Sequence, residues 1–261
     1  MAADIGGVGS THINHLTPRV LDIDDLYRTM QDRGIEMIDE IQGPPRWDGP
    51  DVLLRQTSFR ALAEPRRFRE ADGSVAPGTL RVRFGEVEAR GIALTVRGRD
   101  LYDQMLGEVD ARLRDAGTGA SRQDVAAGVW RERLPDSEDG LAREDLAFFT
   151  YRVVEEGPAS TDPRTLDAVR RGDLAALVAA GAVIADPVVY EDFLPRSAAG
   201  IFASNLTGAS TMDADQGGAE RDLDWMSDVV GEQVAVPEEV YAAESRASVL
   251  EAGATLGVEL G

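Results

Sequence analysis

The chain has 261 residues, with 47 acidic residues against 27 basic ones and a formal net charge of −20. This balance excludes duplex nucleic acid as an expected partner, because phosphate binding needs a basic face. There is no cysteine, which excludes disulfides, Cys-ligated metal centres and a thiol nucleophile. There is no lysine either, and His12 and His15 are the only histidines. Chemistry that needs a reactive lysine, or three imidazoles from one chain, is therefore excluded as well.

The sequence shows no targeting or membrane-spanning pattern. No segment reaches the ~18 consecutive apolar residues of a membrane helix. The first residues have neither the basic start nor the apolar core of a signal peptide. We therefore expect a soluble, cytoplasmic protein without a membrane partner.

The first part of the chain has the pattern of a β-α-β-β-β unit. A helix is predicted at residues 22–34, with an aspartate at its cap, Leu26 and Met30 in an apolar stripe, and Gly34 at its end. Strands are predicted at residues 11–20, 35–41, 52–59 and 79–91. A polar insertion at about residues 69–79 precedes the last strand, which alternates over its whole length.

The second part mixes helices and strands. Ser121 and Asp124 form a capping box before one of the predicted helices. Helices are predicted at residues 97–116, 126–133, 162–181 (broken at Gly172–Asp173) and 236–253, strands at 146–154 and 182–195, and a loop at 134–140. Residues 117–124 mark a boundary, which gives two parts, 1–116 and 117–261. The fold class is therefore α+β.

The two histidines are the first candidates for chemistry. They are three residues apart on a predicted strand, so His12 and His15 point to opposite faces. At most one of them is expected inside the concave side of the sheet. A single histidine is more often a satisfied core or surface residue than a ligand, and nothing local favours the metal-binding role.

Two carboxylates on the last predicted strand are the second candidates. Glu86 and Glu88 share one face with Phe84 and Arg90. Paired carboxylates can bind a metal or transfer a proton, one ligating and the other orienting. The alternative is a charge ladder paired with neighbouring arginines. One imidazole and one carboxylate make two-thirds of the 2-His-1-carboxylate triad of non-haem Fe(II) oxygenases.

A stretch of small residues from Ser197 to Asn205 is the third candidate. Its backbone N–H groups can hold a substrate carboxylate. Close helix packing is the alternative, and for this stretch alone it is favoured.

Several ordered blocks resemble one family, the 2-oxoadipate dioxygenase/decarboxylases, or hydroxyglutarate synthases. The blocks read HINHLTPRVLDIDDLY, LLRQTSFRALAEP, RFGEVEARG and DPVVYEDFLP, followed by SAAGIFASNL. The resemblance covers about residues 4–210. It implies a relationship to the vicinal-oxygen-chelate fold, whose β-α-β-β-β modules pair to form a sheet cupped around a metal.

The resemblance also implies an activity. The family is Fe(II)-dependent and belongs to lysine catabolism: with O₂ it decarboxylates 2-oxoadipate to D-2-hydroxyglutarate and CO₂. The expected cofactor is therefore Fe(II), and the expected partners are a small 2-oxo acid and O₂. Residues 1–116 would form the metal-site module, and residues 117–261 would complete the substrate pocket.

Site roles carry over by motif. The histidine of NHLTPR, His15, and the carboxylate of RFGE, Glu86, are the implied iron ligands, with His12 and Glu88 as second choices. Ser197 is implied to lie near the substrate. Arg196 stands where the family has a small apolar residue, which would alter the preferred substrate length or charge.

Family members are longer than this chain. Their first half carries another histidine ligand and a substrate-binding arginine in an HGAIR-like stretch, and these 261 residues contain no such stretch. We expect a truncated start, a split gene with the N-terminal half as a separate partner, or a shortened homologue. The alternative to an enzyme is a catalytically incomplete fragment or a non-enzymatic metal-binding or structural homologue.

Overall fold

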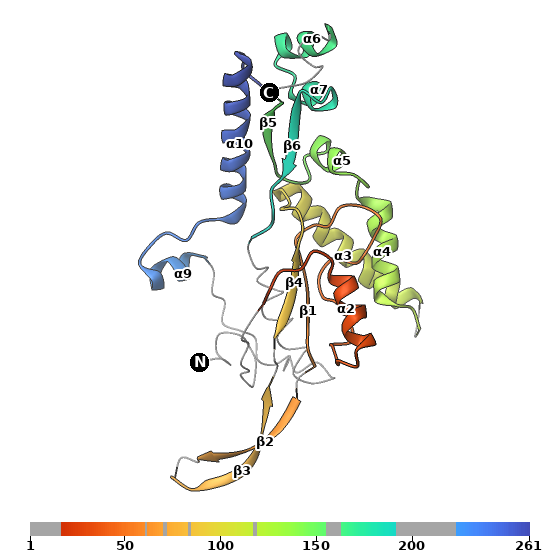
Figure 1. Cartoon of the computed structure of the whole chain (residues 1–261), viewed down its shortest axis with the longest axis vertical. Helices are drawn as coiled ribbons and strands as arrows, with labels where there is room; N and C mark the ends of the chain where they lie inside the picture. Colours follow the sequence, from red (N-terminus) through yellow and green to blue (C-terminus); the bar gives the residue numbers. More distant parts are fainter. Residues whose placement is uncertain are drawn as a thin grey trace. The chain divides into compact units, whose positions relative to one another are not determined.

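The computed structural model describes residues 17–60, 62–69, 72–82, 85–116, 119–154, 163–191 and 223–261 (Figure 1). The chain divides into two compact units, each built from three separate segments. The first unit comprises Met1–Pro44, Leu54–Arg90 and Asp192–Val234, and the second comprises Pro45–Leu53, Gly91–Glu191 and Ala235–Gly261. Both units mix helices with small antiparallel sheets, as the α+β prediction requires.

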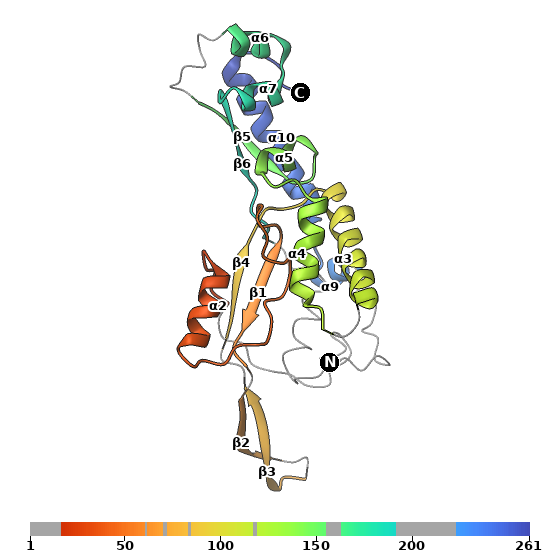
Figure 2. The same cartoon turned by 90° about the vertical axis from the view of Figure 1, so that its right-hand side faces the viewer.

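Helix α2 (Ile23–Asp32) opens the described part of the first unit. The Asp22 carboxylate caps it by accepting a hydrogen bond from the backbone N–H of Asp25 at 2.8 Å. The chain leaves the helix through Gly34 in the left-handed region, with φ of 73°. The helix packs against strands β1 (Leu54–Ser58) and β4 (Glu86–Arg90), as Figure 2 shows.

The sheet of the first unit is built around two strands, and the strand predicted at residues 35–41 does not form: in that stretch Met37 makes only a single bridge, to Phe59. Strands β1 and β4 pair antiparallel. Single bridges extend the sheet on both sides: Arg19 pairs parallel with Glu88, and Gln42 pairs antiparallel with Gln56. The order across the sheet is therefore residue 19, β4, β1, residue 42. Residues 11–16 of the first predicted strand lie outside the described residues.

The long strand predicted at residues 79–91 is wrong, because two strands occupy this stretch. Strand β3 (Val75–Val82) pairs with β2 (Leu62–Arg69) in a hairpin, whereas β4 pairs with β1. Gly85, with φ of 153°, lies directly before β4. The predicted polar insertion thus forms the end of this hairpin, where residues 65–69 and 72–75 are exposed.

The second unit contains a helix pair, α3 (Val96–Ala116) and α4 (Arg122–Arg133), at the predicted places. Ser121 caps α4 as predicted, since its hydroxyl accepts from the backbone N–H of Asp124. The two helices pack on each other. Tyr102 and Trp130 lie in their core, with ring centroids 5.7 Å apart and nearly perpendicular rings.

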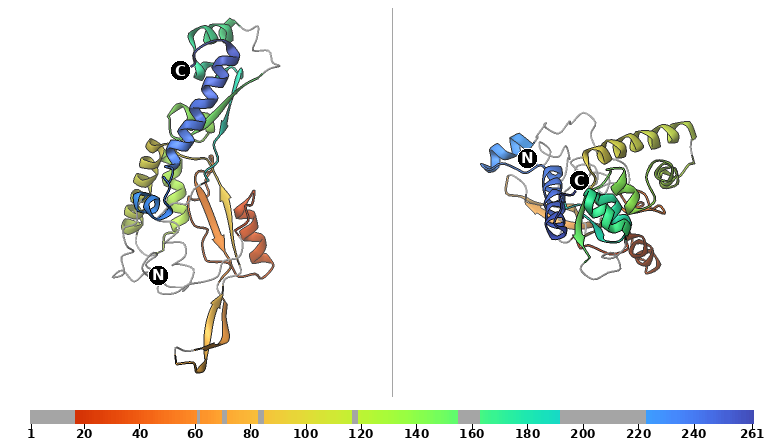
Figure 3. Two further views of the ribbon diagram at one scale, coloured as in Figure 1. Left: turned by 90° about the vertical axis from the view of Figure 1, so that its left-hand side faces the viewer. Right: turned by 90° about the horizontal axis from the view of Figure 1, so that it is seen from above.

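The remainder of the second unit is a two-stranded sheet with helices beside it. Strand β5 (Phe149–Val153) pairs with β6 (Val183–Pro187), and helix α10 (Pro237–Leu256) lies along β5 (Figure 3). Helices α6 (Pro163–Arg171) and α7 (Leu174–Ala179) are separated at Gly172, as predicted, where φ is 65°. Their core contains Leu177 and Val183.

Two short helices were not predicted. Helix α5 (Glu138–Arg143) occupies part of the predicted loop, and Ser137 caps it. Helix α9 (Leu223–Val230) belongs to the first unit. No helix in the described part of the chain is both long and apolar enough to span a membrane. The functional division predicted at residue 116 stays a prediction.

Candidate functional site

One face of the β1–β4 pair carries buried polar side chains. Because opposite residues of antiparallel strands share a face, Ser58 lies beside Glu86 and Gln56 lies beside Glu88. Arg90 follows on the same side of β4. We call these five residues the carboxylate face. Glu86 is 2% exposed and Glu88 is 4% exposed, so they are not a solvated surface ladder.

The other face of the same strands is covered by α2. Arg55 on this side is buried and forms two hydrogen bonds with the Asp24 carboxylate, at 2.6 and 3.0 Å. Its Nε also donates to the carbonyl oxygen of Pro44 at 3.0 Å. These contacts neutralise the buried guanidinium and fix the helix on the sheet. The carboxylate face is therefore the side of the strands turned away from this Arg55–Asp24 pair.

The two carboxylates of this face have different partners. Glu88 accepts from Arg90 Nε at 3.0 Å and Arg90 Nη2 at 3.2 Å, and from Arg19 Nε at 3.4 Å. Glu86 Oε2 instead accepts from the amide Nε2 of Gln56 at 2.5 Å. Glu88 is thus held by two guanidinium groups, and the neutral amide of Gln56 donates to Glu86. The charge-ladder alternative therefore describes the surroundings of Glu88.

Two buried hydroxyls on β1 are also notable. Among the described residues, Thr57 Oγ1 and Ser58 Oγ have no hydrogen-bond partner. Ser58 lies on the carboxylate face, and Thr57 lies on the face covered by α2. Neither Gln56 nor Ser58 is among the candidates that the sequence pattern predicts. Their position could have indicated them, because residues two apart in a predicted strand lie on the same face.

Four of the predicted site residues cannot be placed. His12, His15, Arg196 and Ser197 lie outside the described residues. Within the described ranges, no group of three or more His, Cys, Asp or Glu side chains could hold a metal ion. The predicted combination of an imidazole with Glu86 therefore stays a prediction.

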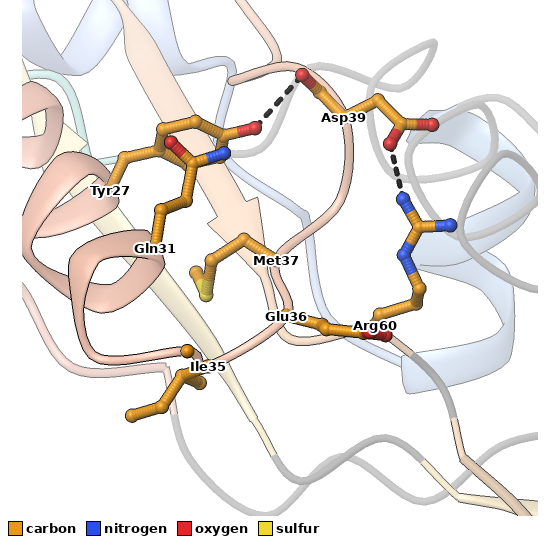
Figure 4. A pocket seen from close by; sticks show the side chains of 8 residues that line it. Tyr27, Gln31, Ile35, Glu36, Met37, Asp39 and Arg60 are labelled. Carbon is orange, nitrogen blue, oxygen red and sulfur yellow. Dashed lines mark hydrogen bonds and ion pairs between the residues drawn. The ribbon is translucent and has the colours of Figure 1, made fainter.

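A separate pocket of about 490 Å³ lies at the end of α2 (Figure 4). The Tyr27 hydroxyl is within hydrogen-bond distance of the carbonyl oxygens of Ile38 (2.6 Å) and Asp39 (2.9 Å). Arg60 forms an ion pair with the Asp39 carboxylate. Burial raises the pKa of Tyr27, and the charge of Asp39 raises it further. The Tyr27 hydroxyl and the Arg60 guanidinium thus have partners within the pocket. We therefore interpret the pocket as a structural feature at the end of the helix and not as a ligand site.

Comparison with known proteins identifies relatives of this chain. A family model described as 2-oxoadipate dioxygenase/decarboxylase matches residues 1–205. The 2-oxoadipate dioxygenase/decarboxylase of Mycobacterium tuberculosis is 50% identical over 243 residues, which are 93% of this chain and 48% of the relative. The Escherichia coli protein of the same name is 44% identical over 226 residues, 85% of this chain and 46% of the relative.

Solved structures give the same picture. The hydroxyglutarate synthase from Pseudomonas putida in complex with 2-oxoadipate is 34% identical, with a TM-score of 0.65 over 95% of this chain and 51% of that chain. The same protein without a named ligand gives a TM-score of 0.62. The chain spans about half the length of the curated relatives it matches.

Proposed function

The chain belongs to the 2-oxoadipate dioxygenase/decarboxylase family, and from this membership we propose that it serves the oxidative decarboxylation of a 2-oxo acid. The proposed substrates are 2-oxoadipate and O₂, and the proposed products are D-2-hydroxyglutarate and CO₂. Identity of 50% over 93% of the chain supports this assignment. The related structure that holds 2-oxoadipate supports the substrate class. Because the chain spans about half of its relatives, the activity is proposed for the chain together with a counterpart of their other half.

The buried carboxylate face is the observation in the structure that supports a metal site. Carboxylate oxygen and imidazole nitrogen are ligands that suit Fe(II). We therefore propose Glu86 and His15 as ligands, with Glu88 and His12 as second choices. Glu86 is the first choice because it is the carboxylate of the RFGE motif, and two arginines already hold Glu88. The Gln56 amide fits an outer-shell role, since such partners fix the orientation of a ligand.

The side chains of this chain would divide the remaining work. Fe(II), when bound, supplies the redox chemistry with O₂ that protein side chains lack. Gln56 keeps the Glu86 carboxylate in one orientation, and the burial of the face limits access of water. Arg196 and Ser197 are proposed to contact the carboxylate of the 2-oxo acid, Arg196 by charge and Ser197 by its hydroxyl.

Metal uptake and oxygen consumption test this function. The purified chain is loaded anaerobically with Fe(II), alone and with the separately produced other half of the M. tuberculosis relative. Iron content is measured, and oxygen uptake is followed with 2-oxoadipate and with a simple dicarboxylate that lacks the 2-oxo group. We expect oxygen uptake only with 2-oxoadipate and not with the dicarboxylate that lacks the 2-oxo group. Absence of iron binding in both preparations would contradict an enzymatic role and favour a structural homologue.

A further inference from the structure

Ser58 is placed directly opposite Glu86 on the carboxylate face. The two residues are cross-strand partners, and such partners have Cβ atoms about 4.5–5.5 Å apart. Ser58 is 1% exposed, and its hydroxyl has no hydrogen-bond partner in the described part of the chain. A buried hydroxyl without a partner destabilises the folded chain, since its hydration is lost and not replaced. A ligand oxygen bound beside Glu86 would give this hydroxyl a hydrogen-bond partner.

Thr57 provides the contrast. It is equally buried, at 0% exposure, and its hydroxyl also has no partner among the described residues. It points to the side covered by α2, away from Glu86. A β-branched side chain packs well in a strand, so packing of its methyl group accounts for Thr57. Ser58 has no methyl group, and packing gives no comparable reason for a serine.

The neighbouring donors are already committed. The Arg90 guanidinium contacts Glu88 with two nitrogens, and Gln56 donates to Glu86. A ligand oxygen beside Glu86 would therefore meet the Ser58 hydroxyl as an available donor on β1. An oxygen-rich, anionic molecule is the ligand class that such a donor suits.

We propose that Ser58 is a substrate-positioning residue whose hydroxyl donates a hydrogen bond to an oxygen of the 2-oxo acid bound beside Glu86. This inference rests on the proposed function and adds a contact from β1 that the sequence motifs did not assign. Ser58 would contribute to substrate affinity and not to metal affinity, because Glu86 and an imidazole hold the metal.

Paired substitutions on β1 test the role of Ser58. The full chain and its S58A and T57V variants, each combined with the separately produced other half of the M. tuberculosis relative, are loaded with Mn(II), which replaces Fe(II) without reacting with O₂. Calorimetry measures the Kd for Mn(II) and then for 2-oxoadipate. For S58A we expect an unchanged Mn(II) affinity and a 2-oxoadipate Kd raised about 5- to 10-fold, the value of one hydrogen bond. For T57V both constants should equal those of the unchanged chain.

The outcomes separate this inference from the proposed function. An S58A chain that binds 2-oxoadipate as tightly as the unchanged chain overturns the role of Ser58 and leaves the function standing. An unchanged chain that binds neither Mn(II) nor 2-oxoadipate in the presence of the added half overturns the proposed function, and the inference with it. If S58A does not fold, S58C carries the test, because its thiol occupies the place of the hydroxyl and is a weaker donor.

Discussion

The side chains of Glu88 and Arg90 are each only 5% exposed and form an ion pair inside the first unit. Removing one partner of a buried pair leaves the other charge in a low-dielectric environment, which destabilises by about 3–5 kcal/mol. The E88Q variant should therefore lose about 3 kcal/mol of unfolding free energy, measured by urea denaturation. A loss below about 1 kcal/mol would show that solvent stabilises the Arg90 guanidinium once the carboxylate is gone.

Glu86 provides the matched substitution two residues away. In E86Q the amide oxygen of the new side chain can still accept from Gln56, so we expect a smaller loss of unfolding free energy than in E88Q. Fe(II) affinity should instead fall by more than about 10-fold, the lower bound for loss of even an outer-shell partner. If E88Q weakens Fe(II) binding and E86Q does not, the two carboxylates have the opposite roles.

Strand periodicity was sufficient to find the carboxylate pair but not to distinguish its members. Alternation alone predicts that Glu86 and Glu88 share a face. Their different roles depend on Gln56, Arg19 and Arg90, and the first two are 30 and 69 residues away from their partners in sequence. Such long-range pairs follow from strand register, which a single sequence does not specify for a sheet of this kind.

At the scale of elements, residues that cap or break a helix predicted its ends correctly. Ser121 and Gly172 marked a helix start and a helix break that the structure confirms. The single strand predicted at residues 79–91 was wrong, because alternation indicates a strand without indicating which strand it pairs with. The hairpin β2–β3 and the pair β1–β4 both use parts of that run. Short α5 was not predicted because a capped helix of fewer than two turns has too few residues to show a helical period.

The helix pair α3–α4 gives a prediction about alkaline pH. Burial raises the pKa of Tyr102 from 10.0 to about 12. Because the folded-state pKa lies above the unfolded one, the neutral tyrosine stabilises the fold fully below pH 10, and this contribution is lost as pH rises toward about 12. The unfolding free energy should fall by about 2–3 kcal/mol across this window, from two pH units at 1.36 kcal/mol each.

The Y102F variant isolates this effect. It keeps the ring that packs against Trp130 and removes the titrating hydroxyl. We expect a shallower fall in unfolding free energy between pH 10 and 12, measured by urea denaturation at several pH values. The absence of lysine removes the other common group that titrates in this window. Identical pH profiles for the two proteins would contradict the assignment of the effect to Tyr102.

At the scale of the whole molecule, the ligand count limits what the chain can do alone. A facial triad takes two histidines and one carboxylate. His12 and His15 are three residues apart, and on a strand such positions face opposite sides. One copy of the predicted strand therefore directs at most one imidazole toward Glu86. We expect weak Fe(II) binding and little turnover from the chain by itself.

The unmatched half of a relative should change both properties. If this half supplies the third ligand, its binding and Fe(II) binding must strengthen each other, because coupling between two ligands is reciprocal. The expected gain in each affinity is roughly 5- to 150-fold. Adding that half of the M. tuberculosis relative should therefore lower the Fe(II) Kd of the chain and start 2-oxoadipate-dependent oxygen uptake. The E86Q chain should show neither change. Tight Fe(II) binding that is identical with and without the added half would mean that the chain's own residues complete the site, through a local break in the strand between His12 and His15.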